Sequence, residues 1–250
     1  MEDVRNLAFF VSDVHLGLDC KDPEDRERRF VSFLKGIPKE KTSALYMLGD
    51  IWDFWYEYRD VVPKGYSRVF ASLHELMDAG VPVFFIPGNH DLWCYRYFEE
   101  LGIKVLRQPY VTQIGGKTFC LGHGDGLGDV GAGYRFMKRI FESRFLQALF
   151  STLHPWIAFR FGKGWSGKSR LSKNIHYEFK RESEPLYKYA VEFSSAQKVD
   201  YFIFGHYHCN ADIELPTGAR LLLTGDWMDG ENYLYFDGIT TFSGHSKNSE

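Results

Sequence analysis

Five short hydrophobic runs of this chain each end at a group of polar side chains that commonly bind metal ions. Apolar runs that stop abruptly at turn-forming residues predict buried β-strands. The runs and the groups that follow them are Leu7–Val11 before Asp13 and His15, Ala44–Leu48 before Asp50, Val83–Ile86 before Asn89, His90 and Asp91, Thr118–Leu121 before His123, and Tyr201–Phe204 before His206 and His208. Because loops at one end of successive strands lie at the same edge of a sheet, we expect these side chains to gather there.

The chemistry of these side chains narrows the kind of site. They are carboxylates, imidazoles and one amide, with no thiolate, which suits manganese, iron or zinc better than a structural zinc site. Asp50 is the natural bridging carboxylate. Two cations about 3.5–4 Å apart would acidify a shared water and stabilise both the attacking and the leaving oxygen of a phosphoryl transfer. The sequence therefore predicts a two-metal hydrolytic site.

Each group has a simpler explanation when it is considered alone. Asp13 and His15 are typical of a turn or a hydrogen-bonded pair, and Gly88-Asn89-His90-Asp91 is typical of a tight turn. His206 and His208 fall on one face of an extended chain, where they could be buried and satisfied. The occurrence of all five groups in this order favours the metal site.

The five groups resemble the motifs of the calcineurin-like metallophosphoesterases. The matching segments are Ser12-Asp13-Val14-His15, Gly49-Asp50, Gly88-Asn89-His90-Asp91, Gly122-His123-Gly124-Asp125 and Gly205-His206-Tyr207-His208. The resemblance implies an α/β fold with two stacked mixed β-sheets flanked by helices. It also implies catalytic roles for His90, which would touch the phosphate, and for Asp91, which would orient it.

The resemblance further implies two divalent metal ions, with Mn²⁺ as the expected metal. One ion would be held by Asp13, His15, Asp50 and His208. The other would be held by Asp50, Asn89, His123 and His206. Asp50 is shared between the two sets.

Composition is consistent with one core and an insertion. A chain of 250 residues with 44% hydrophobic content can bury a substantial core. Its four cysteines have no paired spacing, which favours a reducing compartment. We expect neither a signal peptide nor a membrane span, since no apolar run approaches about 20 residues. Residues 1–130 and 198–250 are predicted to form the core, and residues 131–197 an inserted helical lid.

The predicted lid is basic and aromatic. Residues 131–181 contain eleven Lys or Arg against two acidic residues. Helical periodicity runs from Tyr134 to Phe150 and puts Ile140, Phe141, Phe145 and Leu149 near one face. Three explanations remain open: the aromatic residues pack the lid onto the core, the segment binds nucleic acid, or it meets an amphiphilic substrate at a membrane surface. A lid over the metals favours a compact ligand with an apolar part.

A finer resemblance points to the UDP-2,3-diacylglucosamine diphosphatase branch of the superfamily, which acts in lipid A biosynthesis. The segments that carry it are Gly49–Trp55, His123–Asp129 followed by Tyr134, and Trp165–Arg170. The best-known members have Arg where this chain has His90, so the chain resembles a divergent subgroup. The resemblance implies hydrolysis of UDP-2,3-diacylglucosamine to UMP and 2,3-diacylglucosamine 1-phosphate.

The same resemblance implies where the substrate binds and where the protein works. The expected substrate contacts are Asn89, His90, Tyr134, Ser166, Lys168 and Arg170. The substrate would be a lipid-linked sugar nucleotide, and the protein would be cytoplasmic and peripheral to the inner membrane, in contact with its anionic surface. No nucleic acid and no obligate protein partner are expected. Two alternatives remain: a metallophosphoesterase for another ester (a nucleotide, a nucleic acid end or a phosphoprotein), and a non-catalytic scaffold, which would predict an eroded ligand set.

Overall fold

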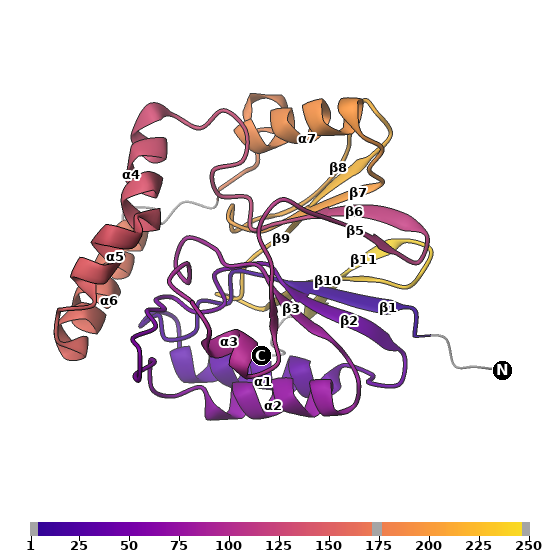
Figure 1. Ribbon diagram of the computed structural model, residues 1–250. Coiled ribbons are helices and arrows are strands. Elements are labelled where there is room, and N and C mark those ends of the chain that lie inside the picture. Colours follow the sequence, from indigo (N-terminus) through magenta and orange to yellow (C-terminus); the bar gives the residue numbers. More distant parts are fainter. Residues whose placement is uncertain (1–4, 172–176, 247–250) are drawn as a thin grey trace.

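The computed structural model describes residues 5–171 and 177–246, which form two mixed β-sheets flanked by helices (Figure 1). The six-stranded sheet has the order β11-β10-β1-β2-β3-β4, and the five-stranded sheet has the order β5-β6-β7-β9-β8. The strands of the first sheet are β1 Leu7–Val11, β2 Thr42–Met47, β3 Val83–Phe85, β4 Lys104–Val105, β10 Glu231–Phe236 and β11 Thr241–Ser246. Those of the second are β5 Tyr110–Ile114, β6 Lys117–Leu121, β7 Tyr201–Phe204, β8 Asn210–Glu214 and β9 Arg220–Thr224. This architecture confirms the predicted fold class.

Strand β1 is buried on both faces of its sheet, which explains why the sequence Leu7–Val11 is apolar throughout. Phe9 and Val11 pack on the helix-covered side of the first sheet, while Ala8 and Phe10 pack in the core between the two sheets. Successive side chains of a strand point to opposite faces, so a strand buried on both sides has no polar alternation. The ring of Phe10 stacks on Phe119 of the second sheet, with centroids 5.7 Å apart.

The outer layers are helical. Helices α1 (Pro23–Gly36), α2 (Ser67–Asp78) and α3 (Tyr97–Glu100) lie against the first sheet, and α7 (Pro185–Ala196) lies against the second, after the short 3₁₀ helix η1 (Arg181–Ser183) (Figure 1). Helix α1 contributes Phe30 and Leu34 to the outer core of the first sheet. Helix α7 contributes Leu186 and Ala190 to a separate core with the second sheet.

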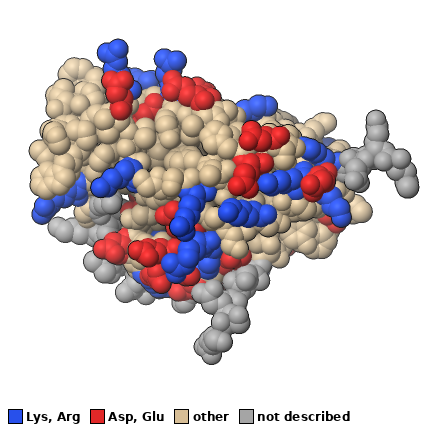
Figure 2. Space-filling view, turned by 90° about the horizontal axis from the view of Figure 1, so that it is seen from below, with Lys and Arg blue, Asp and Glu red and all other residues tan. Residues whose placement is uncertain are grey.

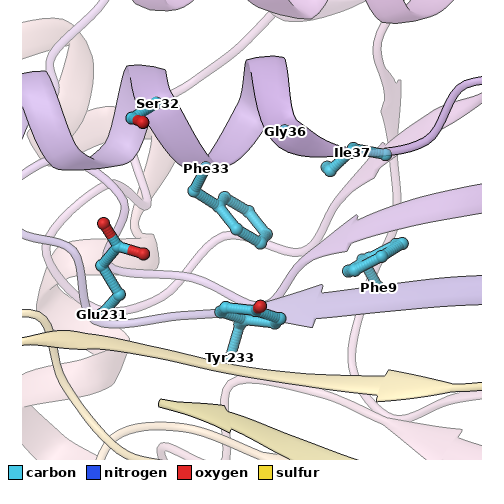
Figure 3. Close-up of a pocket in the computed structure, with 7 residues that line it drawn as sticks. All are labelled: Phe9, Ser32, Phe33, Gly36, Ile37, Glu231 and Tyr233. Atoms are coloured by element: carbon cyan, nitrogen blue, oxygen red, sulfur yellow. The ribbon is translucent and has the colours of Figure 1, made fainter. Parts of the chain in front are cut away.

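A cavity of about 200 Å³ lies between α1 and strand β10 (Figure 3). Aromatic rings of Phe9, Phe33 and Tyr233 line it, and Phe33 packs on Tyr233 with ring centroids 4.6 Å apart. The carboxylate of Glu231 is at its rim (Figure 3). None of the expected site residues whose side chains the structure describes lines this cavity, so it belongs to the packing of α1 on the sheet.

The basic segment forms three helices that stand beside the two-sheet body (Figure 1). They are α4 (Ala132–Glu142), α5 (Arg144–Phe150) and α6 (Pro155–Leu171). The helical pattern predicted over residues 134–150 is interrupted at Ser143, which has extended backbone and caps α5 by accepting a hydrogen bond from the Leu146 amide. Because α7 packs on the second sheet whereas α4–α6 stand apart, the boundary between core and lid within residues 131–197 stays a prediction.

The stacked rings between the sheets generate a stability prediction. Phe10→Ala should lower the free energy of unfolding by about 3–5 kcal/mol, because it removes a fully buried ring and leaves a cavity. Chemical denaturation measures this change. The matched control is Ile239→Ala, whose side chain is exposed and whose replacement should change stability by less than about 0.5 kcal/mol. Equal effects of the two substitutions would contradict this account of the core.

Candidate metal centre

The loops after β1, β2, β6 and β7 bring five of the seven expected metal ligands together. One candidate group joins Asp13, Asp50 and His123, and another joins Asp13, His15 and His208, with all ligand atoms of each group within 4.8 Å of one another. Asp13 appears in both groups. The structure thus gathers side chains up to 195 positions apart in the chain at one edge of the sheets.

The backbone of this cluster is unusual. Five expected ligands are non-glycine residues in the left-handed region: Asp13 (φ 52°), His15 (φ 50°), Asp50 (φ 54°), His206 (φ 71°) and His208 (φ 53°). L-residues adopt this region rarely, and holding them there costs of order 1–3 kcal/mol each. Such strain persists only where surrounding contacts fix the loops, and it concentrates at functional sites.

Two glycines allow the loops to approach each other. A Cβ atom on Gly49 would lie 2.7 Å from both the Gly88 amide nitrogen and His123 Nδ1. A Cβ atom on Gly88 would meet the backbone nitrogen of Asp50 at 2.8 Å. Side chains at these positions would push the second, third and fourth motifs apart, which explains why glycine precedes the ligands there.

Each of three imidazoles has an oxygen near its Nδ1 atom. His123 Nδ1 lies 2.9 Å from the Leu48 carbonyl oxygen, and His208 Nδ1 lies 3.2 Å from Asp226 Oδ2. His15 Nδ1 lies 3.4 Å from Asp53 Oδ1. A metal-binding histidine is normally oriented in this way through its second nitrogen.

The opposite ring nitrogens of these histidines face the buried carboxylates. His123 Nε2 lies 3.3 Å from Asp50 Oδ2. The Nε2 atoms of His15 and His208 lie 3.7 and 3.6 Å from Asp13 Oδ1. These separations are too long for good hydrogen bonds, and they place imidazole nitrogens and carboxylate oxygens close together, as the ligands of a cation would be.

Two buried atoms of the cluster are left without a hydrogen bond within the part of the chain that the structure describes. They are Asp13 Oδ1 and His123 Nε2. A buried polar atom without a partner costs about 1–3 kcal/mol, so such orphans call for an explanation. A divalent cation coordinated by these atoms would satisfy both, and carboxylate with imidazole is a donor set that fits it.

The electrostatics of the cluster are consistent with cation binding. Burial, assisted by the charge of His123, lowers the pKa of His206 to about 3, which favours the neutral imidazole that binds metals. Burial opposes ionisation of Asp50, yet the charges of His123 and His90 hold its pKa well below the ordinary value. Asp50 is therefore an anion that imidazolium groups, or metal ions in their place, stabilise.

Asp91 ties the second and third loops together. Its Oδ1 accepts hydrogen bonds from the amides of Gly88 (2.7 Å) and Asp50 (3.2 Å), and its Oδ2 accepts from those of Ile51 (2.8 Å) and Trp52 (3.3 Å). Burial and the charge of Asp50 raise the pKa of Asp91 to about 7. These contacts favour a positioning role for Asp91, through the loops that carry Asp50 and His90.

His90 is oriented by a different residue. Its Nδ1 lies 2.8 Å from the Asp53 carbonyl oxygen, and its Nε2 lies 4.0 Å from Asp50 Oδ2. The ring is therefore at the edge of the cluster, where the sequence predicts contact with phosphate. Asn89 precedes it in the same loop with an exposed side chain, so its role as a ligand stays a prediction.

Of the predicted lid contacts, the structure describes one side chain. Tyr134 donates from its hydroxyl to Asp125 Oδ2 at 3.2 Å, and Lys138 Nζ lies 2.8 Å from the same oxygen. Asp125 thus fastens α4 to the loop after β6. Ser166, Lys168 and Arg170 belong to α6, but their side chains lie outside the described part of the structure.

Sequence reasoning missed two buried arginines of α1. Arg26 donates to the carbonyl oxygens of His15 (2.8 Å) and Leu18 (3.2 Å), and also to that of Cys20. Arg29 donates to the carbonyl oxygens of Gly230 (2.7 Å) and Trp227 (3.1 Å). They hold the loop that carries His15 and the segment that follows Asp226. Their i, i+3 spacing offered no signal, because surface helices carry arginine at the same spacing.

The sequence model of the calcineurin-like phosphoesterase family matches residues 8–210 of this chain. The chain therefore belongs to the calcineurin-like phosphoesterase family and is a metal-dependent hydrolase. Among its relatives, the UDP-2,3-diacylglucosamine hydrolase of Porphyromonas gingivalis (strain W83) is 36% identical over 95% of this chain and 96% of that protein. The UDP-2,3-diacylglucosamine hydrolase of Aeromonas salmonicida is 30% identical over 89% of this chain and 86% of that protein.

Among solved structures, a dimetal phosphatase from Danio rerio aligns with 96% of this chain and 98% of that chain, at a TM-score of 0.49 and 14% identity. The sequence matches, and not this overlap, carry the family assignment. No helix in residues 5–171 or 177–246 is both long and apolar enough to cross a membrane.

Asp50, the carboxylate that the sequence predicts to be shared by two metal ions, generates the next prediction. Loss of an outer partner of a metal ligand costs about 10–100-fold in affinity, so Asp50→Asn should weaken Mn²⁺ binding by more than about 100-fold and remove metal-dependent hydrolysis. Titration calorimetry with Mn²⁺ measures the affinity. The exposed Asp19→Asn is the control of equal charge change. A folded Asp50→Asn protein that binds Mn²⁺ like the parent would exclude this centre.

The missed arginines generate another prediction. Arg26→Met should weaken Mn²⁺ binding by about 10–100-fold, because the His15 loop loses the donor that holds its left-handed backbone. The measurement is the electron paramagnetic resonance signal of free Mn²⁺ during titration. Arg28→Met, at an exposed position of the same helix, should bind Mn²⁺ normally. Equal affinity of all three proteins would mean that Arg26 serves the fold alone.

Proposed function

We propose that this protein hydrolyses the pyrophosphate bond of UDP-2,3-diacylglucosamine, giving UMP and 2,3-diacylglucosamine 1-phosphate with two divalent metal ions, which we take to be Mn²⁺. The observation that supports this substrate most is 36% identity to the Porphyromonas gingivalis hydrolase across 95% of the chain. The buried cluster of carboxylates and imidazoles with two orphaned atoms supports the metal-dependent chemistry.

The expected ligand sets divide this cluster in two. When bound, the cations would acidify a water molecule and neutralise charge on the phosphoryl oxygens. The residues that would hold one cation are Asp13, His15, Asp50 and His208, and those that would hold the other are Asp50, Asn89, His123 and His206. Asp50 suits the shared position because one of its oxygens faces both His15, at 3.7 Å, and His123.

His90 would supply the chain's own stabilisation of the phosphoryl group. Its Nδ1 is engaged by the Asp53 carbonyl oxygen, which leaves Nε2 for a substrate oxygen. A charged imidazolium at that edge would donate a short hydrogen bond to a non-bridging oxygen, where negative charge increases during the reaction. Asp91 would act indirectly, by fixing the loop that presents His90.

We propose further that residues 131–197 act as a lid, with Tyr134, Ser166, Lys168 and Arg170 in contact with substrate, and that the protein works in the cytoplasm against the anionic inner membrane. Helices α4–α6 expose many large apolar side chains, as expected for a ligand or surface with an apolar part. They include Phe136, Met137, Phe145, Leu149, Trp156 and Phe161. On the face in Figure 2, uncharged atoms dominate the end of the molecule that these helices occupy.

The substrate assignment is tested by comparing two substrates. With Mn²⁺, the purified protein should turn over UDP-2,3-diacylglucosamine and release UMP, and it should leave a simple phosphomonoester nearly untouched. Chromatographic detection of UMP and a phosphate assay measure the two reactions. Turnover of the monoester alone would reject the lipid assignment and favour a phosphoesterase for another ester.

The role of His90 is tested by two substitutions. His90→Gln should lower kcat by about 100-fold, since loss of one donor to a developing oxyanion costs about 10²–10³-fold. His90→Arg, which introduces the residue found in the best-known members of the branch, should stay within about tenfold of the parent. Equal rates for all three proteins at saturating substrate would exclude His90 from the reaction.

A further inference from the structure

A second pocket lies where helix α5 meets the core, away from the predicted ligands. It has a volume of about 410 Å³ and is formed by residues 56–59, the segment 95–100 around α3, and one face of α5. The α5 residues on its wall are Arg144, Gln147, Ala148 and Ser151, which recur at helical spacing. None of the metal-centre residues lines this junction pocket.

The two acidic residues of the junction pocket are already engaged. Glu57 accepts hydrogen bonds from the amides of Tyr95 (2.6 Å), Arg96 (3.0 Å) and Tyr97 (3.1 Å) at the start of α3. Glu100 pairs with Arg96, with 3.5 Å between Arg96 Nε and Glu100 Oε1. Glu57 is thus held by backbone amides, and Glu100 by Arg96.

Two further arginines, Arg59 and Arg144, lie on the pocket wall. Among the described residues, neither Arg59 nor Arg144 lies within 4.0 Å of a carboxylate, so neither forms an ion pair. The Arg144 guanidinium lies over the ring of Tyr95, 5.8 Å from its centroid, which orients it with its donors available. Arginine forks of this kind bind phosphate oxygens in pairs.

The basic helix α4 differs in this respect. Arg135 Nη1 lies 3.1 Å from Asp129 Oδ1, and Lys138 Nζ lies 2.8 Å from Asp125 Oδ2. Some of the positive charge that the sequence assigns to the lid is thus paired internally. Among the described residues, Arg144 of α5 and Arg59 of the loop opposite it form no such ion pair.

We propose that the junction pocket is a second, non-catalytic site that binds a phosphate group, carried by a lipid head group or by a free phosphate ester. Helix α5 exposes Phe145 (77%) and Leu149 (58%) beside Arg144 and Ala148, so a bilayer lipid is the source the surface fits best. A ligand there touches the core through Arg59 and Tyr95 and the lid through Arg144. Its binding therefore fastens α5 to the core.

Hydrogen bonds around the pocket already connect α5 to the core, so a ligand bound there would strengthen an existing attachment. The Tyr56 hydroxyl donates to the Gln147 carbonyl oxygen at 2.7 Å, and the Tyr95 hydroxyl donates to Gln147 Oε1 at 3.1 Å. The helix is thus already held at one residue on the pocket wall. A phosphate between Arg59 and Arg144 adds a charged bridge at the same junction.

The test is vesicle binding by the full chain with Mn²⁺ present. An arginine near an anionic surface contributes about fivefold in affinity, so Arg59→Gln with Arg144→Gln should weaken binding to phosphatidylcholine vesicles containing phosphatidylglycerol by about 30-fold. Lys35→Gln with Lys188→Gln removes the same charge from exposed positions of α1 and α7 and should change binding by less than about twofold. Vesicles of phosphatidylcholine alone should bind all three proteins equally weakly.

A second arm identifies the source of the phosphate. Titration with inorganic phosphate detects any site at the metal centre equally in the parent and in the arginine variant, so the difference between them reports the junction pocket. Phosphate binding lost in the variant, with unchanged vesicle binding, would support the pocket and assign it a free phosphate ester. Equal vesicle and phosphate binding by parent and variant, or equal losses in the lysine control, would overturn the proposal.

The outcome is separable from the proposed function. Both double variants should hydrolyse the acylated sugar nucleotide in detergent at the parent rate, because neither changes a residue of the metal centre. The proposal concerns a site that does not depend on the identity of the substrate. If the parent hydrolyses the sugar nucleotide but the arginine variant binds vesicles and phosphate as the parent does, only the junction-pocket proposal has failed. If the arginine variant loses binding but the parent does not hydrolyse the sugar nucleotide, only the proposed function has failed.

Discussion

The bond network of the Asp91 carboxylate is the constraint on which the site depends. One buried side chain accepts hydrogen bonds from the backbones of the β2 and β3 loops, and the Asp50 backbone oxygen in turn accepts from the His15 amide at 2.9 Å. Three motifs are thereby fixed relative to one another. This fixation is what permits Asp50, His15 and Asp13 to remain in left-handed conformations that isolated loops would abandon.

The cluster combines buried carboxylates with imidazoles whose polar atoms cannot all be satisfied by hydrogen bonds within the described part of the protein. Within the described residues, Asp13 Oδ1 and His123 Nε2 lack hydrogen bonds, while the Nδ1 atoms of His123 and His208 each lie within 3.2 Å of an oxygen. Oriented ligand atoms that lack hydrogen bonds raise the free energy of the protein without a cation, and they become favourable when they coordinate one. Arg26 and Arg29 of α1 stabilise the cluster from outside, because they donate hydrogen bonds to the backbone of the loops that carry His15 and Asp226.

Helices α4–α6 differ from the two-sheet body in how their apolar side chains are packed. Many of their large apolar side chains are exposed, whereas most of those of α1, α2 and α7 pack in cores with the sheets. They are attached through aromatic contacts and single hydrogen bonds, such as the bond from Trp93 Nε1 to the Phe141 carbonyl oxygen at 2.8 Å.

The sequence by itself determined where the strands that lead to the metal centre lie and which residues are candidate ligands. The runs at Leu7–Val11 and Tyr201–Phe204 coincide with β1 and β7, because strands buried on both faces are apolar throughout and end where polar groups need solvent or a ligand. Only the tertiary structure decided that Asp53 orients His90, that Asp91 braces two loops, and that Arg26, Arg29, Arg59 and Arg144 hold special positions. Those roles arise from contacts between distant segments, and a local pattern does not encode whether an arginine is buried, paired or free.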